Sequence, residues 1–89
     1  MFQDEKESND VMLLAEEKIL YSHLEYVKQE AQLITVEGEI ITLLENEMRE
    51  GESYDMKKYL DTAQEIAEKK LQMYADLLSN IKQFKAQFL

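Results

Sequence analysis

The sequence predicts an all-α protein built as a long antiparallel helical hairpin, and three observations support this prediction. The 89-residue chain has no proline and only two glycines, and good helix formers dominate its composition. Apolar residues recur every seven positions along two long segments, which is typical of helices that pack lengthwise against other helices. Only one short segment, residues 49–53, resembles a turn.

We expect the first helix to span about residues 10–50. Residues 1–8 are mostly polar, and we expect them to be a frayed segment before the helix. Ser8 or Asn9 is suited to cap a helix that starts near Asp10. The apolar residues of this helix form one line with a spacing of seven and a second line between its members. The first line is Leu13, Leu20, Val27, Ile34, Ile41 and Met48, and the second is Leu24, Ala31 and Gly38.

Gly38 lies inside this helix, where glycine costs about 1 kcal/mol relative to alanine. Two explanations fit its position. It permits the close approach of a second backbone, which we favour, or it breaks the helix. A break near Gly38 would fold the chain into a three-helix bundle within one molecule.

The turn at residues 49–53 leads into a second helix over about residues 53–88. Gly51 suits the left-handed conformation that ends a helix, and Ser53 is a suitable N-cap with Asp55 in the first turn. A connection this short makes the two helices antiparallel neighbours. The apolar residues of the second helix again fall seven apart, at Leu60, Ala67, Tyr74, Ile81 and Phe88, with Ala63, Leu77 and Phe84 between them.

We predict that these apolar lines meet and form the core or interface of the protein. Each helix has more apolar surface than one partner covers, so we also predict a dimer with a four-helix arrangement, in preference to the bent monomer. Lys70 is the charged residue in this pattern, and we favour its reaching to an acid on the first helix over its setting the helix register. The predicted contact residues are Leu20, Leu24, Val27, Ile34, Ile41 and Leu44 on the first helix, and Leu60, Ala67, Tyr74, Leu77, Ile81 and Phe84 on the second.

The residues predict no catalytic, cofactor-binding or metal-binding site. The chain has no cysteine, and His23 is its only histidine, which we expect to be interfacial or exposed. No Glu-x-x-His pair or HExxH motif suggests a metal centre, and no glycine-rich loop suggests a phosphate site. We therefore predict that the chain is not an enzyme.

The charge of the chain is concentrated in its first half. Residues 1–50 carry thirteen acidic residues against four basic ones, and residues 51–89 carry six of each. An acidic surface repels nucleic acid and anionic lipid, so we expect neither as a partner. The acidic half either attracts a basic protein surface or serves only solubility. With no signal peptide and no apolar run of about 20 residues, we expect a cytoplasmic protein.

The paired leucines Leu43 and Leu44 are followed by an acidic turn, by Tyr54 and Asp55, by an aromatic residue at Tyr59 and by a closing Phe84. The segment that these residues span resembles the C-terminal region of the kinesin-13 family, the microtubule-depolymerising kinesins with an internal motor. The resemblance covers roughly half of the chain. The acidic turn is slightly longer than in that family, and His23 lies farther upstream than the histidine that the family often shows. The matching residues after the acidic turn are Tyr54, Asp55, Tyr59, Ile66, Lys70, Ile81, Lys82 and Phe84.

This resemblance implies a dimerisation or regulatory module of a motor protein, located at microtubules, the spindle or the centrosome. The chain itself has no nucleotide-binding loop and could not hydrolyse ATP. Its acidic half would be repelled by tubulin and could dock on a lysine-rich neck or motor surface of the same protein. The alternatives are a generic coiled-coil scaffold and a helical adaptor that receives a partner helix.

Overall fold

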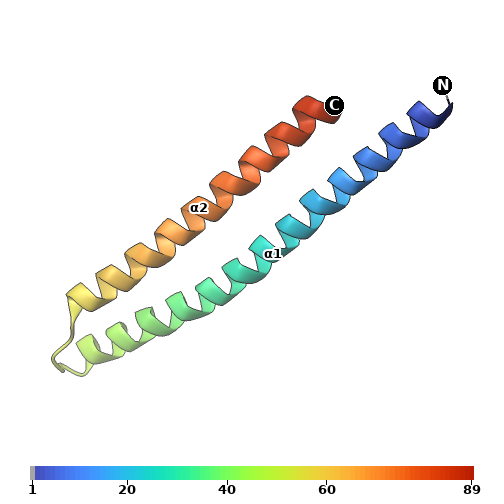
Figure 1. The fold of residues 1–89 in the computed structure, drawn as a ribbon. Helices are drawn as coiled ribbons and strands as arrows, with labels where there is room; N and C mark the ends of the chain where they lie inside the picture. The colour runs from blue at the N-terminus through green and yellow to red at the C-terminus, as the bar shows by residue number, and fades with distance from the viewer. Residues whose placement is uncertain (1) are drawn as a thin grey trace.

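Two antiparallel α-helices joined by a tight turn make up the structure (Figure 1). The computed structural model describes the backbone of residues 2–89 and the side chains of residues 10–89. Helix α1 spans Phe2–Arg49 and helix α2 spans Met56–Phe88, and this part of the chain contains no strand. The start of α1 and the end of α2 lie at the same end, where α1 extends past α2 (Figure 1). The predicted helical hairpin is therefore confirmed.

Helix α1 is longer and more continuous than predicted. It runs without a break through Gly38, so the chain does not form the three-helix bundle. It also begins at Phe2, well before the predicted start near Asp10, because no proline or glycine interrupts these residues once the helix is nucleated. The side chains of Ser8 and Asn9, which we considered as caps, lie outside the described residues.

The end of α1 has the backbone hydrogen bonds of a Schellman motif. Gly51 adopts a positive φ of 72°, as predicted for the residue that ends the helix. The Glu52 N–H donates to the Glu47 carbonyl at 3.0 Å, and the Gly51 N–H donates to the Met48 carbonyl at 3.3 Å. These bonds satisfy carbonyl groups that the end of the helix leaves without intrahelical partners.

The cap of α2 is Asp55, and the prediction of Ser53 as the cap was wrong. The helix begins at Met56, so Asp55 directly precedes it with an extended backbone. The Asp55 carboxylate accepts a hydrogen bond from the Lys58 N–H at 2.9 Å. Residues 52–54 therefore belong to the connection between the helices.

The hairpin is one layer thick and has a very small core. It measures 75 × 17 × 14 Å, and its radius of gyration is 20.8 Å, compared with about 12 Å for a compact domain of this length. Ile66, Met73 and Leu77 are its buried side chains among the described residues, at 5%, 8% and 9% exposure. All three lie on α2, and none of the side chains described on α1, those of residues 10–49, reaches that degree of burial.

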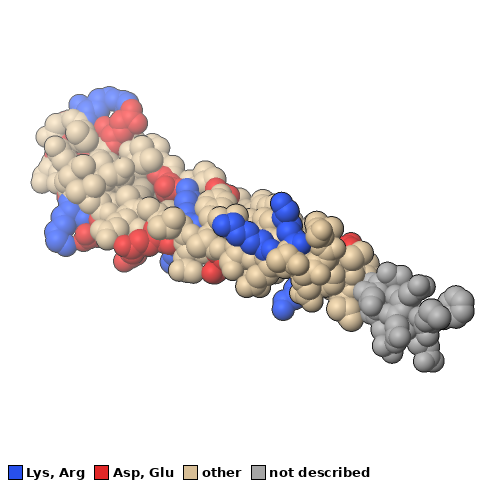
Figure 2. Space-filling model, turned by 90° about the horizontal axis from the view of Figure 1, so that it is seen from above, with Lys and Arg blue, Asp and Glu red and all other residues tan. Residues whose placement is uncertain are grey.

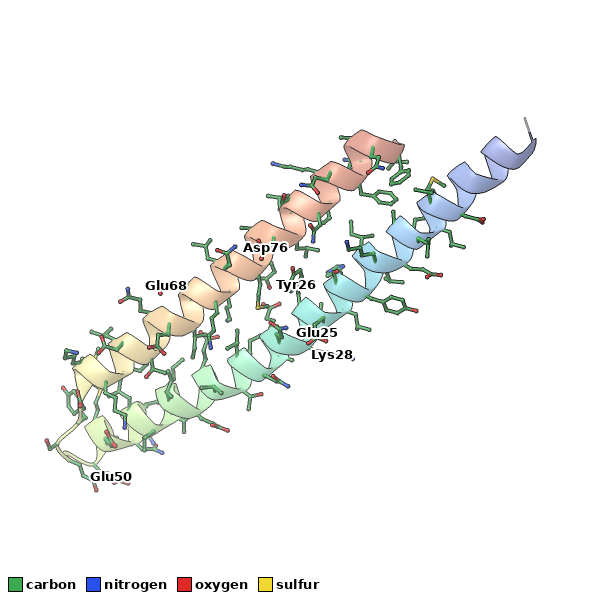
Figure 3. All side chains as sticks on the ribbon, viewed as in Figure 1. Glu25, Tyr26, Lys28, Glu50, Glu68 and Asp76 are labelled. Carbon is green, nitrogen blue, oxygen red and sulfur yellow. The ribbon has the colours of Figure 1, made fainter. Side chains whose placement is uncertain are left out.

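Helix α1 packs against α2 through a different side from the one predicted. Half-buried residues of α1 also form a line with a spacing of seven, and each residue of that line comes one position before an apolar residue that was predicted to face α2. One position turns a helix by about 100°, so a neighbouring side of α1 meets α2. Figure 3 shows Tyr26 on the side toward α2 and Lys28 on the side away from it. This line contains Met12, Ile19, Tyr26, Leu33 and Ile40, and Ala15, Ser22, Glu30, Glu37 and Leu44 accompany it.

Most of the predicted contact residues are consequently exposed in the hairpin. Leu77 is buried, and Leu44 and Phe84 are half-buried, so these three lie along the line where the helices meet. The predicted packing of the other nine between α1 and α2 is not found, because α1 has two apolar sides and α2 covers only one of them. Their role in an interface stays a prediction. The exposed nine are Leu20, Leu24, Val27, Ile34 and Ile41 on α1, and Leu60, Ala67, Tyr74 and Ile81 on α2.

Candidate interaction surface

The nine exposed residues form a surface that we name the apolar face. Val27, Ile34 and Ile41 lie near its middle on α1, and their side chains remain 50%, 53% and 48% exposed. On α2, Leu60 and Tyr74 are 52% and 45% exposed. Large apolar side chains exposed along most of a molecule are typical of a protein interaction site.

Both halves of the apolar face lie on the same side of the hairpin. On α1, the exposed residues with a spacing of seven each follow a half-buried residue by one position, as Val27 follows Tyr26. On α2 the same relation holds, since Ala67 follows Ile66 and Tyr74 follows Met73. Because the helices are antiparallel, a turn of about 100° in the direction of the chain carries both lines to one side.

Two polar contacts between the helices lie at the border between the buried line and the apolar face. The Lys70 ammonium forms an ion pair with the Glu37 carboxylate, and their side chains are 24% and 31% exposed. This is the reach to an acid on α1 that the sequence predicted for Lys70. The Tyr74 hydroxyl donates a hydrogen bond to the Glu30 carboxylate. The pKa of Tyr74 is raised by this bond first, then by partial removal from water and by the negative charge of Glu30.

The exposed area of the hairpin is too large for a compact monomer. The chain exposes 7445 Å², compared with about 5,400 Å² for a folded monomer of 10.5 kDa. In the space-filling view, broad uncharged surface separates the groups of charged side chains (Figure 2). The excess of about 2,000 Å² is comparable to the total area that a standard protein interface buries.

The described residues contain no cluster of side chains that could hold a metal ion. No three metal-ligating side chains gather among them, and His23 is exposed. The hollows between the helices are open and lined largely by apolar and neutral polar side chains, such as Ser22, Asn80 and Gln83. Neither described helix has an apolar stretch of the length that crossing a membrane requires.

Sequence reasoning missed the side of α1 that α2 covers and the bond between Glu30 and Tyr74. The covered side carries its own line of apolar residues with a spacing of seven, so the signal was present. Two such lines on one helix have the same period, and the period alone does not rank them. The bond between Glu30 and Tyr74 has no sequence signature, because it depends on how the two helices align.

Comparison with protein-family models, with curated proteins and with solved structures found no match for this chain. The resemblance to the kinesin-13 family therefore stays a prediction.

Proposed function

We propose that the chain is a non-catalytic module that joins protein chains through helix–helix contact of its apolar face. The observation that carries this proposal is the exposure of a line of large apolar residues along the length of α1. Burial of a leucine, isoleucine or valine side chain stabilises a protein by about 1.5–3 kcal/mol. The three side chains that are buried in the described part of the chain make a very small core. A partner helix would extend that core along α1.

The mass of the purified chain in solution tests this proposal. We expect light scattering to show a mass above that of one chain, with association increasing between about 1 μM and 1 mM. Ile34→Glu places a charge on the apolar face and should abolish association. Val36→Glu is the matched control. Val36 is 41% exposed, and two positions turn a helix by about 200°, so Val36 lies on the opposite side of α1 from Ile34.

The outcome that overturns the proposal is equally direct. A mass of 10.5 kDa at the highest concentration, with helix content retained, would show that the hairpin is stable with its apolar face in water. Equal association of the Ile34→Glu and Val36→Glu variants would show that the contact lies elsewhere.

A narrower form of the proposal is the C-terminal dimerisation or regulatory module of a kinesin-13. One observation favours it, since four of the six residues that carry the resemblance on α2 lie on the side that packs against α1, whereas Ile81 and Lys82 are exposed. Ile66 is buried, and Tyr59, Lys70 and Phe84 are half-buried against α1. Most of the resemblance on α2 therefore falls on residues that pack against α1.

The partner in this narrower form is a basic neck or motor surface. Residues 10–49 of α1 carry nine acidic residues against three basic ones, so attraction should be strongest at low salt. We expect the chain to bind a kinesin-13 neck–motor fragment and to reduce its microtubule-depolymerising activity. Glu25→Lys with Glu39→Lys changes two exposed acids outside the apolar face and should weaken this binding while leaving self-association intact.

If the chain neither binds the neck–motor fragment nor changes its activity at low salt, the regulatory role is wrong. The general proposal of an association module would then still stand or fall on the mass measurement. A scaffold or adaptor role is the remaining alternative, in which the apolar face receives a helix of another protein.

A further inference from the structure

We infer that the apolar face binds a second copy of the same hairpin, with both turns at the same end and α1 of each copy packed against α2 of the other. This inference rests on the proposed function and adds the partner and its orientation. The product is a four-helix bundle in which every neighbouring pair of helices is antiparallel. A two-fold axis parallel to the helices relates the two copies, and self-complementary contacts of this kind are the commonest in soluble oligomers.

The charges of the two helices favour this pairing. The described part of α1 carries nine acidic residues against three basic ones, whereas α2 carries six lysines against four acidic residues. Packing α1 against α2 of the second copy brings an acidic helix to a basic one on both sides of the bundle. Packing α1 against α1 brings two acidic helices together and leaves the two basic helices as neighbours.

Particular charged residues at the rim of the apolar face agree with this pairing. Glu17 and Glu45 extend the line of Leu24, Ala31 and Gly38 at its two ends. Lys57 and Lys85 lie beside the apolar line of α2, on the side away from α1 of the same copy.

The alignment of the hairpin places these residues at matching levels. The ion pair between Glu37 and Lys70 and the bond between Glu30 and Tyr74 fix which residues of the two helices lie side by side. With both turns at the same end, this alignment also holds between copies. Glu17 then lies at about the level of Lys85 of the second copy, and Glu45 lies at about the level of Lys57.

The residue types on α1 argue against a simple two-stranded coiled coil of two α1 helices. In that packing the second line of Leu24, Ala31 and Gly38 would fill the a positions, and Val27 and Ile34 would fall at d positions. Two-stranded parallel coiled coils prefer leucine at d and branched residues at a. In this chain Leu13 and Leu20 fit that preference, but the central d positions, Val27, Ile34 and Ile41, are β-branched, and no a position has a β-branched residue.

Gly38 gives a further reason to expect a helix against this face. Space for its missing Cβ is open in the hairpin, with no atom within 4 Å, so packing within one copy does not require glycine there. Ala67 lies at about the same level on α2 and is also small. Two small residues at one level let a second hairpin approach closely.

A distance between the two turns tests the orientation. The chain has no cysteine, so Ser53→Cys introduces a single site for a spin label in the exposed turn. With both turns at one end, we expect pulsed electron spin resonance to give a distance of at most about 30 Å. Turns at opposite ends would lie about 50 Å apart or more, because α2 has 33 residues at 1.5 Å each.

Light scattering on the same labelled sample separates the two proposals. A dimer with the long distance overturns the inferred orientation and leaves the association module standing. A single-chain mass overturns both.

Charge reversal at the rim tests which helices meet. Glu17→Lys with Glu45→Lys, and separately Lys57→Glu with Lys85→Glu, should each weaken self-association by about tenfold, through four like-charge contacts per dimer. Glu45 and Lys57 also pair with Arg49 and Asp61 of their own helix, so the helix content of each variant is measured alongside. Mixing the two variants should restore it, because every rim pair is then of opposite charge. If the Glu17→Lys, Glu45→Lys variant associates normally by itself, or if mixing the two variants does not restore association, α1 does not pack against α2 of the second copy. The inference is then wrong.

Discussion

Tyr74 and Glu30 come from different helices, and their hydrogen bond depends on the alignment of the hairpin. The hydroxyl group donates its proton to the carboxylate, so the bond exists only while Tyr74 is neutral. Ionisation would remove the donor and place two negative charges side by side. The raised pKa therefore reports on the contact between α1 and α2.

We predict that Tyr74 ionises above its usual pKa of 10.0. The difference between the alkaline absorbance titrations of the unchanged chain and of Tyr74→Phe isolates this residue and should have its midpoint above pH 10. Because the folded-state pKa is raised, the stabilising effect of the bond is complete below pH 10 and is lost as the pH rises through the raised value. Glu30→Gln should lower the midpoint, and a midpoint at or below 10 would show that the two side chains do not meet.

The two glycines predict opposite responses to the same substitution. Gly38→Ala should stabilise the dilute hairpin by about 0.5–1 kcal/mol, because the new Cβ meets nothing within 4 Å and alanine favours the helix. Gly51→Ala should destabilise it by about 1–2 kcal/mol, because Gly51 holds a φ of 72°. Urea denaturation measures both, and destabilisation by Gly38→Ala in the dilute chain would mean that a side chain already fills that space.

At the scale of the element, the N-terminus of α2 depends on one carboxylate. Asp55→Ala removes the acceptor of the Lys58 N–H and should destabilise the hairpin by about 1 kcal/mol. Ser53→Ala is the matched control, because Ser53 precedes the cap and lies in the connection. Thermal denaturation followed by circular dichroism compares them. An equal loss in both variants would contradict Asp55 as the cap that stabilises α2.

The inner side of α2 contains the side chains whose loss should matter most. Leu77 is 9% exposed, whereas Leu71 on the same helix is 72% exposed. We expect Leu77→Ala to destabilise the hairpin by about 2–5 kcal/mol, and Leu71→Ala to change stability by no more than about 0.5 kcal/mol. Both are read from urea denaturation, and a Leu77→Ala variant with unchanged stability would contradict the packing of α2.

The existence of both helices and of their turn followed from the sequence because those features are local. Good helix formers, the position of Gly51 and the absence of proline act within a few residues of each other. Which side of α1 meets α2 is not local. Tyr26 and Val27 are neighbours in the sequence, and both lie on apolar lines with a spacing of seven. Choosing between them requires the shape of the facing helix, which the period of one helix does not contain.

The same limit decided how much of the candidate site was predictable. On α2, Leu77 and Phe84 were predicted to pack against α1, and the structure places them there. Ile34 and Ile41 were predicted to do so and are instead exposed. Both are apolar, as the sequence shows, but the sequence did not show that they lie outside the contact between α1 and α2.

At the scale of the whole molecule, the hairpin has an unusual balance of surface and core. It exposes about 2,000 Å² more than a compact monomer of its mass, and the buried side chains among residues 10–89 all lie on α2. A second copy stacked on the apolar face would place Ile34 and Ile41 in the centre of a four-helix bundle. Most of the folding free energy would then come from association, so stability would depend on protein concentration.

This dependence gives a prediction for the intact chain without any substitution. A hundredfold increase in protein concentration adds about 2.7 kcal/mol to the stability of a dimer, which corresponds to a rise in Tm of about 5–10 °C for two chains of 89 residues. Thermal denaturation at about 5 μM and 500 μM measures it, and Ile34→Glu, which cannot bury its charge, should show a low Tm that concentration does not change. A Tm that is independent of concentration in the unchanged chain would mean that one hairpin holds its fold alone. The apolar face would then be free for a helix of a different protein.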